Sequence, residues 1–406
     1  MRHVLLIAEM GGELGHLATL SALSAALCQR GDKVTVLVRE LARAVPHFSG
    51  QAVTLLQAPV WRRALPVQTP RGSMATILYR YGFASPSELY AYLQAWRDLV
   101  DLLRPDLLVL DYAPTAWLAL RDRHVPLLVT GFAFGAPVPG QPLPEWTMPS
   151  LTTAVTGQWP SLELADVERQ VLATINECQH QDRLSPLASV SELFVADGMA
   201  LSQLAELDPQ QPWREPACYA GPLTPALVGK PVHWQSSTSK RVLAYIKPGW
   251  PKLEILLQQL HEQGVELEAF YRGPLPTEWQ RWLGPTFRIG SQPLDLRSAL
   301  CSADLMICHA GIGSLSLALG AGCPSLCLPQ QTEQRGNSEL VVQQGWGAQL
   351  TGDESLEQMA ACLQSYWQHD GYRCRTREVA ARYHQSPTPL SRLLATCDRL
   401  LARGGD

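Results

Sequence analysis

The sequence predicts an α/β protein built from two arrays of β/α/β units. Short apolar runs alternate with helical stretches along both halves of the 406 residues, an alternation that is typical of parallel sheets. The composition, 46% hydrophobic and 17% charged, excludes a disordered chain. At roughly 100 to 200 residues per domain, this length predicts two to three domains, each able to bury its own core. We therefore expect one parallel sheet in each half.

In the first half, apolar runs and helix-stop residues define strands and helices in turn. A strand, a helix and a strand are expected at 4–8, 16–30 and 34–38, with the Gly31-Asp32 stop before the second strand. Further strands are expected at 107–110, 126–130 and 193–196, and further helices at 86–103, 114–122 and 162–176. The proline-rich residues 134–159 predict an ordered surface loop of the kind that lines a pocket.

A segment rich in Pro, Ser, Thr and Gly separates the two halves and predicts a domain boundary. The expected division is a first domain at 1–223, a linker at 224–240, a second domain at 241–385, and a C-terminal helix at 386–406 that packs back on the first domain. The elements expected in the second half are strands at 242–246, 267–271, 286–289, 305–308 and 324–328, and helices at 252–263, 294–301, 314–320, 355–366 and 390–402.

Charge, hydropathy and cysteine spacing exclude several classes of protein. The net charge of -4 and the lack of a basic tract argue against a nucleic-acid partner. The uncharged stretch 305–332 exceeds the roughly 18 residues of a membrane span, but its glycines and prolines predict a buried β-α-β unit instead of a transmembrane segment. The N-terminal apolar run stops at Glu9, too early for a signal peptide. The ten cysteines lack a CxxC pair, so we expect a cytoplasmic protein with reduced thiols.

Two loops that pass from a strand into a helix are the candidate ligand sites. In an open α/β sheet the ligand lies beyond the carboxyl ends of the strands, where a helix N-terminus offers N–H groups to a phosphate. The first loop, EMGGELGH, follows the first strand, and the second, CHAGIGS, follows the strand at 305–308. In the second loop Gly311 and Gly313 would let the backbone approach a ligand, while His309 and Ser314 would donate to a diphosphate. Equally, the glycines could serve close helix packing and the histidine could be a core residue.

A resemblance to a known family is carried by the segment that begins at His309, HAGIGSLSLALGAGCPSLCLPQQTEQRGNSELVVQQGWG. It resembles the donor-binding motif of the UDP-glycosyltransferase-like superfamily (GT-B fold, glycosyltransferase family 1), which usually shows His-x-Gly-x-x-Ser/Thr, Gly-x-Pro and Pro-x-x-x-Asp/Glu-Gln-x-x-Asn. Near the N-terminus, GELGHLATLSALSAALCQRGDKVTVL is similar to the family's first strand, Gly-His loop and helix, and ACYAGPL is similar to the end of its N-terminal domain. The resemblance implies two Rossmann-like β/α/β domains facing a cleft, the first binding the acceptor and the second the nucleotide sugar.

The same resemblance implies roles for six residues of the second domain. Those that would hold the donor's diphosphate are His309, Gly311, Gly313 and Ser314, and those that would bind hydroxyls of the transferred sugar are Glu333 and Gln334. Carboxylate acceptors and amide donors suit a polyhydroxylated ring, because leaving such buried groups unpaired costs about 1 to 3 kcal/mol each. Without the resemblance, the Glu-Gln pair could equally be a solvated helix start.

Leu317 departs from the family pattern. At this position many UDP-sugar enzymes carry a Glu whose carboxylate binds the ribose hydroxyls, so its loss favours a deoxyribose donor such as a dTDP-sugar and leaves a UDP-sugar open. Gly313 stands where plant members have Asn, and no Trp occupies the base-stacking position, so the contact to the base is unassigned.

His16 and Asp111 are the candidate catalytic pair, since both match the family's His-Asp dyad. An imidazole can take the proton of an acceptor hydroxyl near neutral pH, and a carboxylate can orient its other nitrogen. The alternatives are that His16 only begins a helix and that Asp111 caps the next helix. The expected reaction is a single displacement that inverts the anomeric carbon. Because no DxD motif appears, no metal ion, and no cofactor beyond the nucleotide sugar, is expected.

The sequence is also weighed against three other functions. A dinucleotide-dependent oxidoreductase would need a G-x-G-x-x-G loop, which is absent after the first strand. A sugar-nucleotide epimerase of the same fold would carry a different donor motif, and a non-catalytic sugar-nucleotide-binding partner protein would tolerate loss of the His-Asp pair. Aromatic residues in 61–82 and 132–159 favour a small apolar or aromatic acceptor, with a lipid as the alternative. The oligomeric state is left unpredicted.

Overall fold

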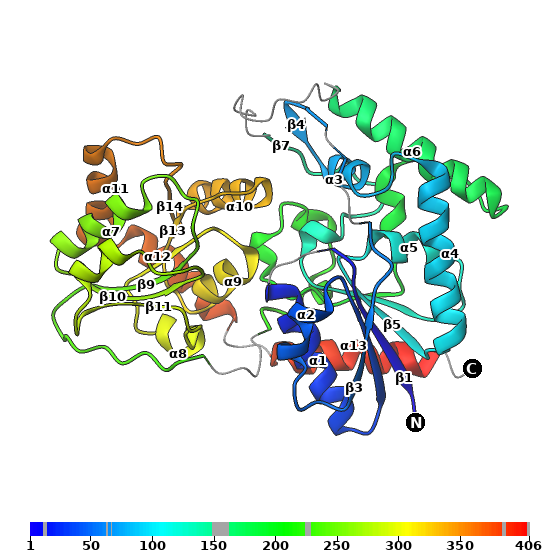
Figure 1. Ribbon diagram of the computed structural model, residues 1–406, viewed down its shortest axis with the longest axis horizontal. Coiled ribbons are helices and arrows are strands. Elements are labelled where there is room, and N and C mark those ends of the chain that lie inside the picture. The colour runs from blue at the N-terminus through cyan, green and yellow to red at the C-terminus, as the bar shows by residue number, and fades with distance from the viewer. Residues whose placement is uncertain are drawn as a thin grey trace. The chain divides into compact units, whose positions relative to one another are not determined.

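The computed structural model describes residues 1–10, 14–61, 64–65, 67–147, 162–223, 229–383 and 387–403. The chain forms two compact units (Figure 1). The first unit comprises Met1–Ala226 and Thr388–Asp406, and the second comprises Leu227–Pro387. The C-terminal helix therefore belongs to the first unit, although the second unit precedes it in the sequence.

The first unit is built on a six-stranded parallel sheet with the order β3-β2-β1-β5-β6-β8. Its strands are β1 (His3–Ala8), β2 (Lys33–Val38), β3 (Val53–Gln57), β5 (Leu107–Asp111), β6 (Leu127–Thr130) and β8 (Gly198–Met199). The chain moves outward from β1 to β3 and then returns to place β5 on the other side of β1. Strand order thus reverses between β1 and β5, which is where open α/β sheets bind ligands at their carboxyl edge.

Both faces of the first sheet are covered, which is why its strands are apolar throughout. Alternate residues of β1 point to opposite faces. Val4 and Leu6 pack with α1 (Leu14–Gln29) and α13 (Pro389–Arg403), two helices that contact each other and cross in Figure 1. Leu5 and Ile7 belong to the core of the opposite face. The helices of that face are α3 (Met74–Arg80), α4 (Pro86–Leu103), α5 (Pro114–Leu120) and α6 (Leu164–Gln181).

Shorter elements complete the first unit. A short helix, α2 (Leu41–Ala44), follows β2, and a two-stranded antiparallel ribbon pairs β4 (Arg71–Gly72) with β7 (Trp146–Thr147). The ribbon includes Trp146 and Thr147, the last described residues of the predicted proline-rich loop. Residues 148–159 of that loop lie outside the described residues.

The second unit repeats the architecture with the order β11-β10-β9-β12-β13-β14, again all parallel. Its strands are β9 (Arg241–Ile246), β10 (Glu266–Tyr271), β11 (Phe287–Gly290), β12 (Leu305–Cys308), β13 (Ser325–Cys327) and β14 (Gly347–Gln349). Here strand order reverses between β9 and β12. The fold class expected from the sequence, α/β with two Rossmann-like domains, is confirmed for each unit.

Helices cover the second sheet as they cover the first. Its main core joins β9 and β10 to α7 (Leu253–Glu262) and α11 (Leu356–Gln368). The helix α9 (Ile312–Gly320) packs on β12 and β13 and contacts α8 (Leu296–Leu300) and α12 (Gly371–Tyr383). Next to β14 lies α10 (Thr332–Gln343). The uncharged stretch 305–332 is thus the buried β-α-β unit expected, and none of the described helices is long and apolar enough to cross a membrane.

One predicted strand, 193–196, is wrong. Residues Val190–Phe194 form a 3-10 helix, and the strand that joins the sheet, β8, begins only at Gly198. The indole of Trp117 donates to the Val195 carbonyl at 2.7 Å and packs edge-on against Phe194, whose ring centroid is 5.1 Å away. These contacts draw the apolar run into the helical layer instead of the sheet.

The described part of the predicted linker, 229–240, is held by the second unit. Lys230 pairs with Leu294, and the backbone N–H groups of Gln235 and Ser236 donate to the buried carboxylate of Glu266 at 2.6 and 2.9 Å. The ten cysteines form no disulfide.

Candidate functional site

The predicted catalytic pair meets at the strand-order reversal of the first sheet. His16 lies in the first turn of α1, directly after the loop that follows β1, and Asp111 is the last residue of the neighbouring strand β5. Although 95 residues separate them, His16 Nδ1 lies 2.7 Å from Asp111 Oδ1. The Asp111 side chain is fully buried and the His16 side chain is 13% exposed. A buried carboxylate therefore orients an imidazole that solvent can still reach.

Neighbouring groups hold this pair from several sides. The Tyr112 ring stacks on the imidazole at a centroid distance of 5.9 Å, and Phe132 contacts it edge-on at 5.2 Å. Gly131, at the end of β6, has a φ of +82°, and a Cβ atom there would lie 2.2 Å from Asp111 Oδ1. The other carboxylate oxygen, Asp111 Oδ2, has no hydrogen-bond partner among the described residues. Asp111 is thus packed so closely that a methyl group beside it would displace it.

The alternative role for Asp111, as the N-cap of the next helix, is wrong. The N-cap of α5 is Ala113, whose side chain makes no capping bond. Instead, the free amides of this helix donate to Glu9, whose Oε2 accepts from the N–H groups of Thr115 and Ala116 at 2.9 and 3.1 Å. Asp111 is consequently available to His16 because another carboxylate caps the helix.

Glu9 is a buried group that the sequence analysis missed. It is only 3% exposed, and burial raises the pKa of its carboxyl to about 7, although bonds from Thr115 and Ala116 and the charge of Arg39 act in the opposite direction. In the sequence it resembled only the residue that ends an apolar run. A polar residue directly after a strand of an α/β sheet was the indication that could have identified it.

Aromatic rings extend from the predicted catalytic pair into the predicted acceptor loops. Beyond Tyr112 lies Phe134 at a centroid distance of 6.1 Å, and beyond Phe134 lies Trp146 at 5.2 Å. The chain of rings therefore runs from His16 to the β4-β7 ribbon. It joins residues of the predicted acceptor-binding segment 132–159 to the histidine.

In the second unit, His309 also lies at the strand-order reversal, but its ring is engaged. Its Nδ1 lies 2.7 Å from the Leu328 carbonyl, and its Nε2 accepts from the backbone N–H of Lys247 at 2.9 Å. Because Lys247 N–H is the donor, the proton of a neutral ring must sit on Nδ1. In this state the ring has no N–H for a diphosphate. The predicted donor role of His309 would need Nε2 to be protonated and released from the Lys247 amide.

The predicted glycine-rich turn does lead into a helix N-terminus. Gly311 is the N-cap of α9, and the space that a Cβ would occupy there is open. Gly313 and Ser314 are half-buried in the first turn. The turn itself is fixed by Ala310, which has a φ of +58° and whose carbonyl accepts from Asn337 at 3.0 Å. The backbone amides of this turn, with Ser314, are the groups that suit an anion.

Glu333 and Gln334 lie in the first turn of α10, so the pair does begin a helix, as the alternative interpretation expected. Gln334 is buried, however, and not solvated. Its Oε1 accepts from the backbone N–H groups of Gln330 and Gln331 at 2.9 and 3.2 Å. This capping uses the carbonyl oxygen of the Gln334 side chain and not its amide nitrogen. Glu333 Oε1 lies 3.4 Å from Asn337 Nδ2, which links the predicted sugar site to the turn of α9.

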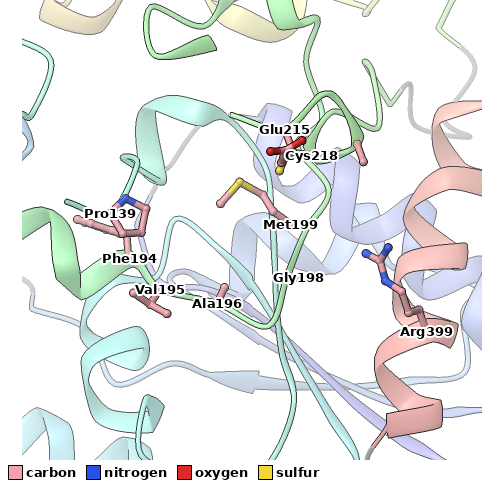
Figure 2. Close-up of a pocket in the computed structure, with 10 residues that line it drawn as sticks. Pro139, Phe194, Val195, Ala196, Gly198, Met199, Glu215, Cys218 and Arg399 are labelled. Carbon is pink, nitrogen blue, oxygen red and sulfur yellow. The ribbon is translucent and has the colours of Figure 1, made fainter. Parts of the chain in front are cut away.

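Two hollows lie elsewhere in the units. One, of about 380 Å³, is at the edge of the first sheet beside β8, and Figure 2 shows Met199, Phe194 and Val195 around it with Arg399 of α13. The other, of about 420 Å³, is beside β10 and β11 and is lined in part by Gly290, Ser291 and Gln292. None of the predicted site residues lines either hollow. In the described ranges, no three His, Cys, Asp or Glu side chains are grouped as metal ligands.

Two parallel sheets of the same strand order match the fold of solved GT-B glycosyltransferases. The calicheamicin glycosyltransferase CalG4 aligns with a TM-score of 0.70 at 17% identity, over 99% of this chain and 98% of that one. The kitacinnamycin glycosyltransferase aligns with a TM-score of 0.66 at 16% identity, over 98% of both chains. The glycosyltransferase VinC, solved in complex with dTDP, aligns with a TM-score of 0.64 at 13% identity, over 99% of this chain and 100% of that one. No family model and no curated protein matches the sequence.

Replacing Gly131 by Ala should displace Asp111. The left-handed backbone alone should lower the free energy of unfolding by roughly 1 to 2 kcal/mol, and the clash should raise the loss to about 3 kcal/mol or more. Gly31→Ala is the matched control, because Gly31 has a φ of +88° but no atom within 4 Å of the new Cβ. Denaturant unfolding of both variants measures the difference. Equal losses would mean that the contact with Asp111 does not constrain this position.

Replacing Glu9 by Gln should change how stability depends on pH. Because the folded-state pKa of Glu9 is raised from 4.5 to about 7, the wild type binds this proton more tightly when folded and loses stability as pH rises between these values. The free energy of unfolding of Glu9→Gln relative to wild type should therefore increase by about 3 kcal/mol from pH 4.5 to pH 8.

Glu266→Gln is the control of opposite sign. Burial opposes ionisation of Glu266, but hydrogen bonds from Gln235, Ser236 and Arg288 outweigh it and lower its pKa. The free energy of unfolding of Glu266→Gln relative to wild type should therefore fall as pH rises through the acidic end of this pH range, where the carboxyl of the unfolded chain titrates. A Glu9→Gln difference that stays constant with pH would contradict the raised pKa.

Proposed function

We propose that the protein is an inverting glycosyltransferase that moves a sugar from a UDP- or dTDP-sugar to a hydroxyl of a small apolar or aromatic acceptor. The observation that carries this proposal is the 2.7 Å contact between His16 and the buried Asp111 at the strand-order reversal of the first sheet. Such a pair suits proton abstraction from a hydroxyl. The fold shared with solved glycosyltransferases supports the reaction class.

In the proposed mechanism His16 is the general base. With the Nδ1 proton directed to Asp111, Nε2 is the nitrogen that accepts the proton of the acceptor hydroxyl. The oxygen then attacks the anomeric carbon as the bond from that carbon to the diphosphate oxygen breaks, and the configuration inverts. The buried carboxylate stabilises the imidazolium that forms, because few water molecules compete for its charge.

The second unit would bind the donor mainly through its backbone. The first turn of α9 directs N–H groups outward from Gly311, and no side chain of the N-cap blocks it. These amides and Ser314 would hold the diphosphate and stabilise it as it leaves, without a metal ion. Glu333 and the amide nitrogen of Gln334 would bind sugar hydroxyls. Because His309 Nε2 accepts from the Lys247 amide, we assign its ring to holding the turn and not to contacting the ligand directly.

The donor nucleotide is proposed from Leu317, a half-buried residue of α9. An apolar side chain offers no acceptor to a ribose hydroxyl, so a deoxyribose is bound at least as well as a ribose. VinC was solved with dTDP, which supports the same class of donor for a protein of this fold. The aromatic chain from His16 to Trp146 supports an apolar or aromatic acceptor.

Nucleotide binding tests the donor assignment. UDP and dUDP differ only in the 2′-hydroxyl, and thermal shift should show that wild type binds dUDP at least as tightly as UDP. Leu317→Glu adds a carboxylate on the same helix and should shift the preference toward UDP by several-fold. GDP and NAD(P) are the negative controls. Stabilisation by NAD(P) alone, with none from any sugar nucleotide, would reject the transferase assignment.

Replacing His16 by Gln should remove the base and leave donor binding intact. We expect transfer to fall by roughly 100-fold or more, as is usual for loss of a general base, while calorimetry shows an unchanged Kd for dTDP or UDP. His124→Gln, an exposed histidine of the same unit, is the matched control and should retain wild-type turnover. Turnover can be followed as nucleotide diphosphate released with a panel of small phenols as acceptors. Retained transfer by His16→Gln would remove His16 from the mechanism.

A further inference from the structure

Glu9 lies just beyond the strand next to that of Asp111 and caps the helix that follows Asp111. It follows β1 directly, and the last residue of that strand, Ala8, is in register with Asp111 on β5. From there its carboxylate reaches past Asp111 to the amides of Thr115 and Ala116, the second and third residues of α5. A helix whose own N-cap supplies no side-chain acceptor thus depends on a residue more than 100 positions earlier.

The backbone next to Glu9 holds the other end of the same turn. The N–H of Met10 donates to the carbonyl of Tyr112 at 3.0 Å. Tyr112 has a φ of +49°, a left-handed conformation that is costly for a non-glycine residue and persists only where its surroundings impose it. Glu9 and Met10 together therefore tie residues 112–116 to the end of β1 through three hydrogen bonds.

Asp111, directly before this turn, and Tyr112, its first residue, both orient His16. Asp111 bonds its Nδ1, and Tyr112 stacks on its ring. A change in the turn would alter the carboxylate and the stacked ring together.

We propose that Glu9 is a positioning residue, which holds the Asp111–Tyr112 turn in the geometry that orients His16, and that it does so best as a carboxylate. An ionised acceptor makes shorter and stronger bonds to N–H groups and is favoured at a helix N-terminus. The groups that act on its charge are Arg39 at the end of β2 and the hydroxyl and amides of α5, while Asp111 is the other carboxylate on the adjoining strand. Ionisation of Glu9 near pH 7 coincides with the pH range in which a histidine is unprotonated.

The inference rests on the proposed function only in calling His16 catalytic, so its test begins with a readout that needs no substrate. In protein labelled with ¹⁵N-histidine, the His16 Nδ1–H should give a downfield proton resonance protected by its bond to Asp111, assigned by its loss in His16→Gln. Glu9→Asp keeps the charge but shortens the reach by one methylene. We expect Glu9→Asp to lose the His16 Nδ1–H resonance, or to exchange this proton with water at least tenfold faster than wild type at pH 8.

Two further variants distinguish the effects of the length and charge of the Glu9 side chain from a general loss of stability. Glu9→Gln keeps an oxygen at the same reach, so it should retain the resonance. Its activity should rise less steeply between pH 6 and pH 8 than that of wild type, because the ionising group is gone. Glu266→Asp shortens a buried carboxylate that caps two amides in the same way in the second unit, and should leave the His16 resonance unchanged.

Turnover completes the test. Glu9→Asp should lower kcat roughly tenfold or more, since small displacements of a catalytic group reduce rate, while the Kd for dTDP or UDP stays at the wild-type value. A protected resonance and wild-type kcat in Glu9→Asp would overturn the positioning role and leave the transferase proposal standing. A lost resonance in a protein that transfers no sugar to any acceptor would support the positioning role and count against the transferase.

Discussion

The hydrogen bond between His16 and the buried Asp111 is the interaction on which the proposed chemistry of the first unit depends. It forms because two parallel neighbours, β1 and β5, end at the same edge of the sheet, so residues far apart in sequence emerge side by side. Around it the structure leaves little freedom: Gly131 lies against the carboxylate, and Tyr112 and Phe132 lie against the imidazole. The bond is oriented by packing and by a cap contributed from Glu9, not by the pair alone.

The second unit has the same topology but places different groups at its strand-order reversal. At its strand-order reversal the side chain of His309 is engaged with the backbone at Lys247 and Leu328, so the groups directed outward are mainly amides of α9. Backbone donors in a rigid turn suit an anionic group because they need no reorganisation when it binds. One architecture therefore carries the His16–Asp111 pair in one unit and, in our proposal, a backbone site for the donor's diphosphate in the other.

Much of this arrangement could be predicted, and the failures have physical causes. The regular strands of both sheets were identifiable because burial on both faces makes them continuous apolar runs. The run at 193–196 has the same composition, but Trp117 draws it into a 3-10 helix, a contact that no local pattern contains. The His16–Asp111 pair was predicted from the resemblance, whereas Glu9 was missed because its partners, the amides of α5, lie more than 100 residues away.

By itself, the sequence determined the fold class, the two parallel sheets and the residue types at their carboxyl edges, because burial, helix stops and glycine-rich turns act over short stretches of chain. Only the tertiary structure decided how those residues share the available hydrogen bonds. Glu9 caps α5 and leaves Asp111 to His16, Gln334 Oε1 accepts from the amides before its own helix, and the His309 ring bonds the backbone. Such choices depend on which buried donors and acceptors lie within about 3 Å of one another, and that is a property of the packed molecule.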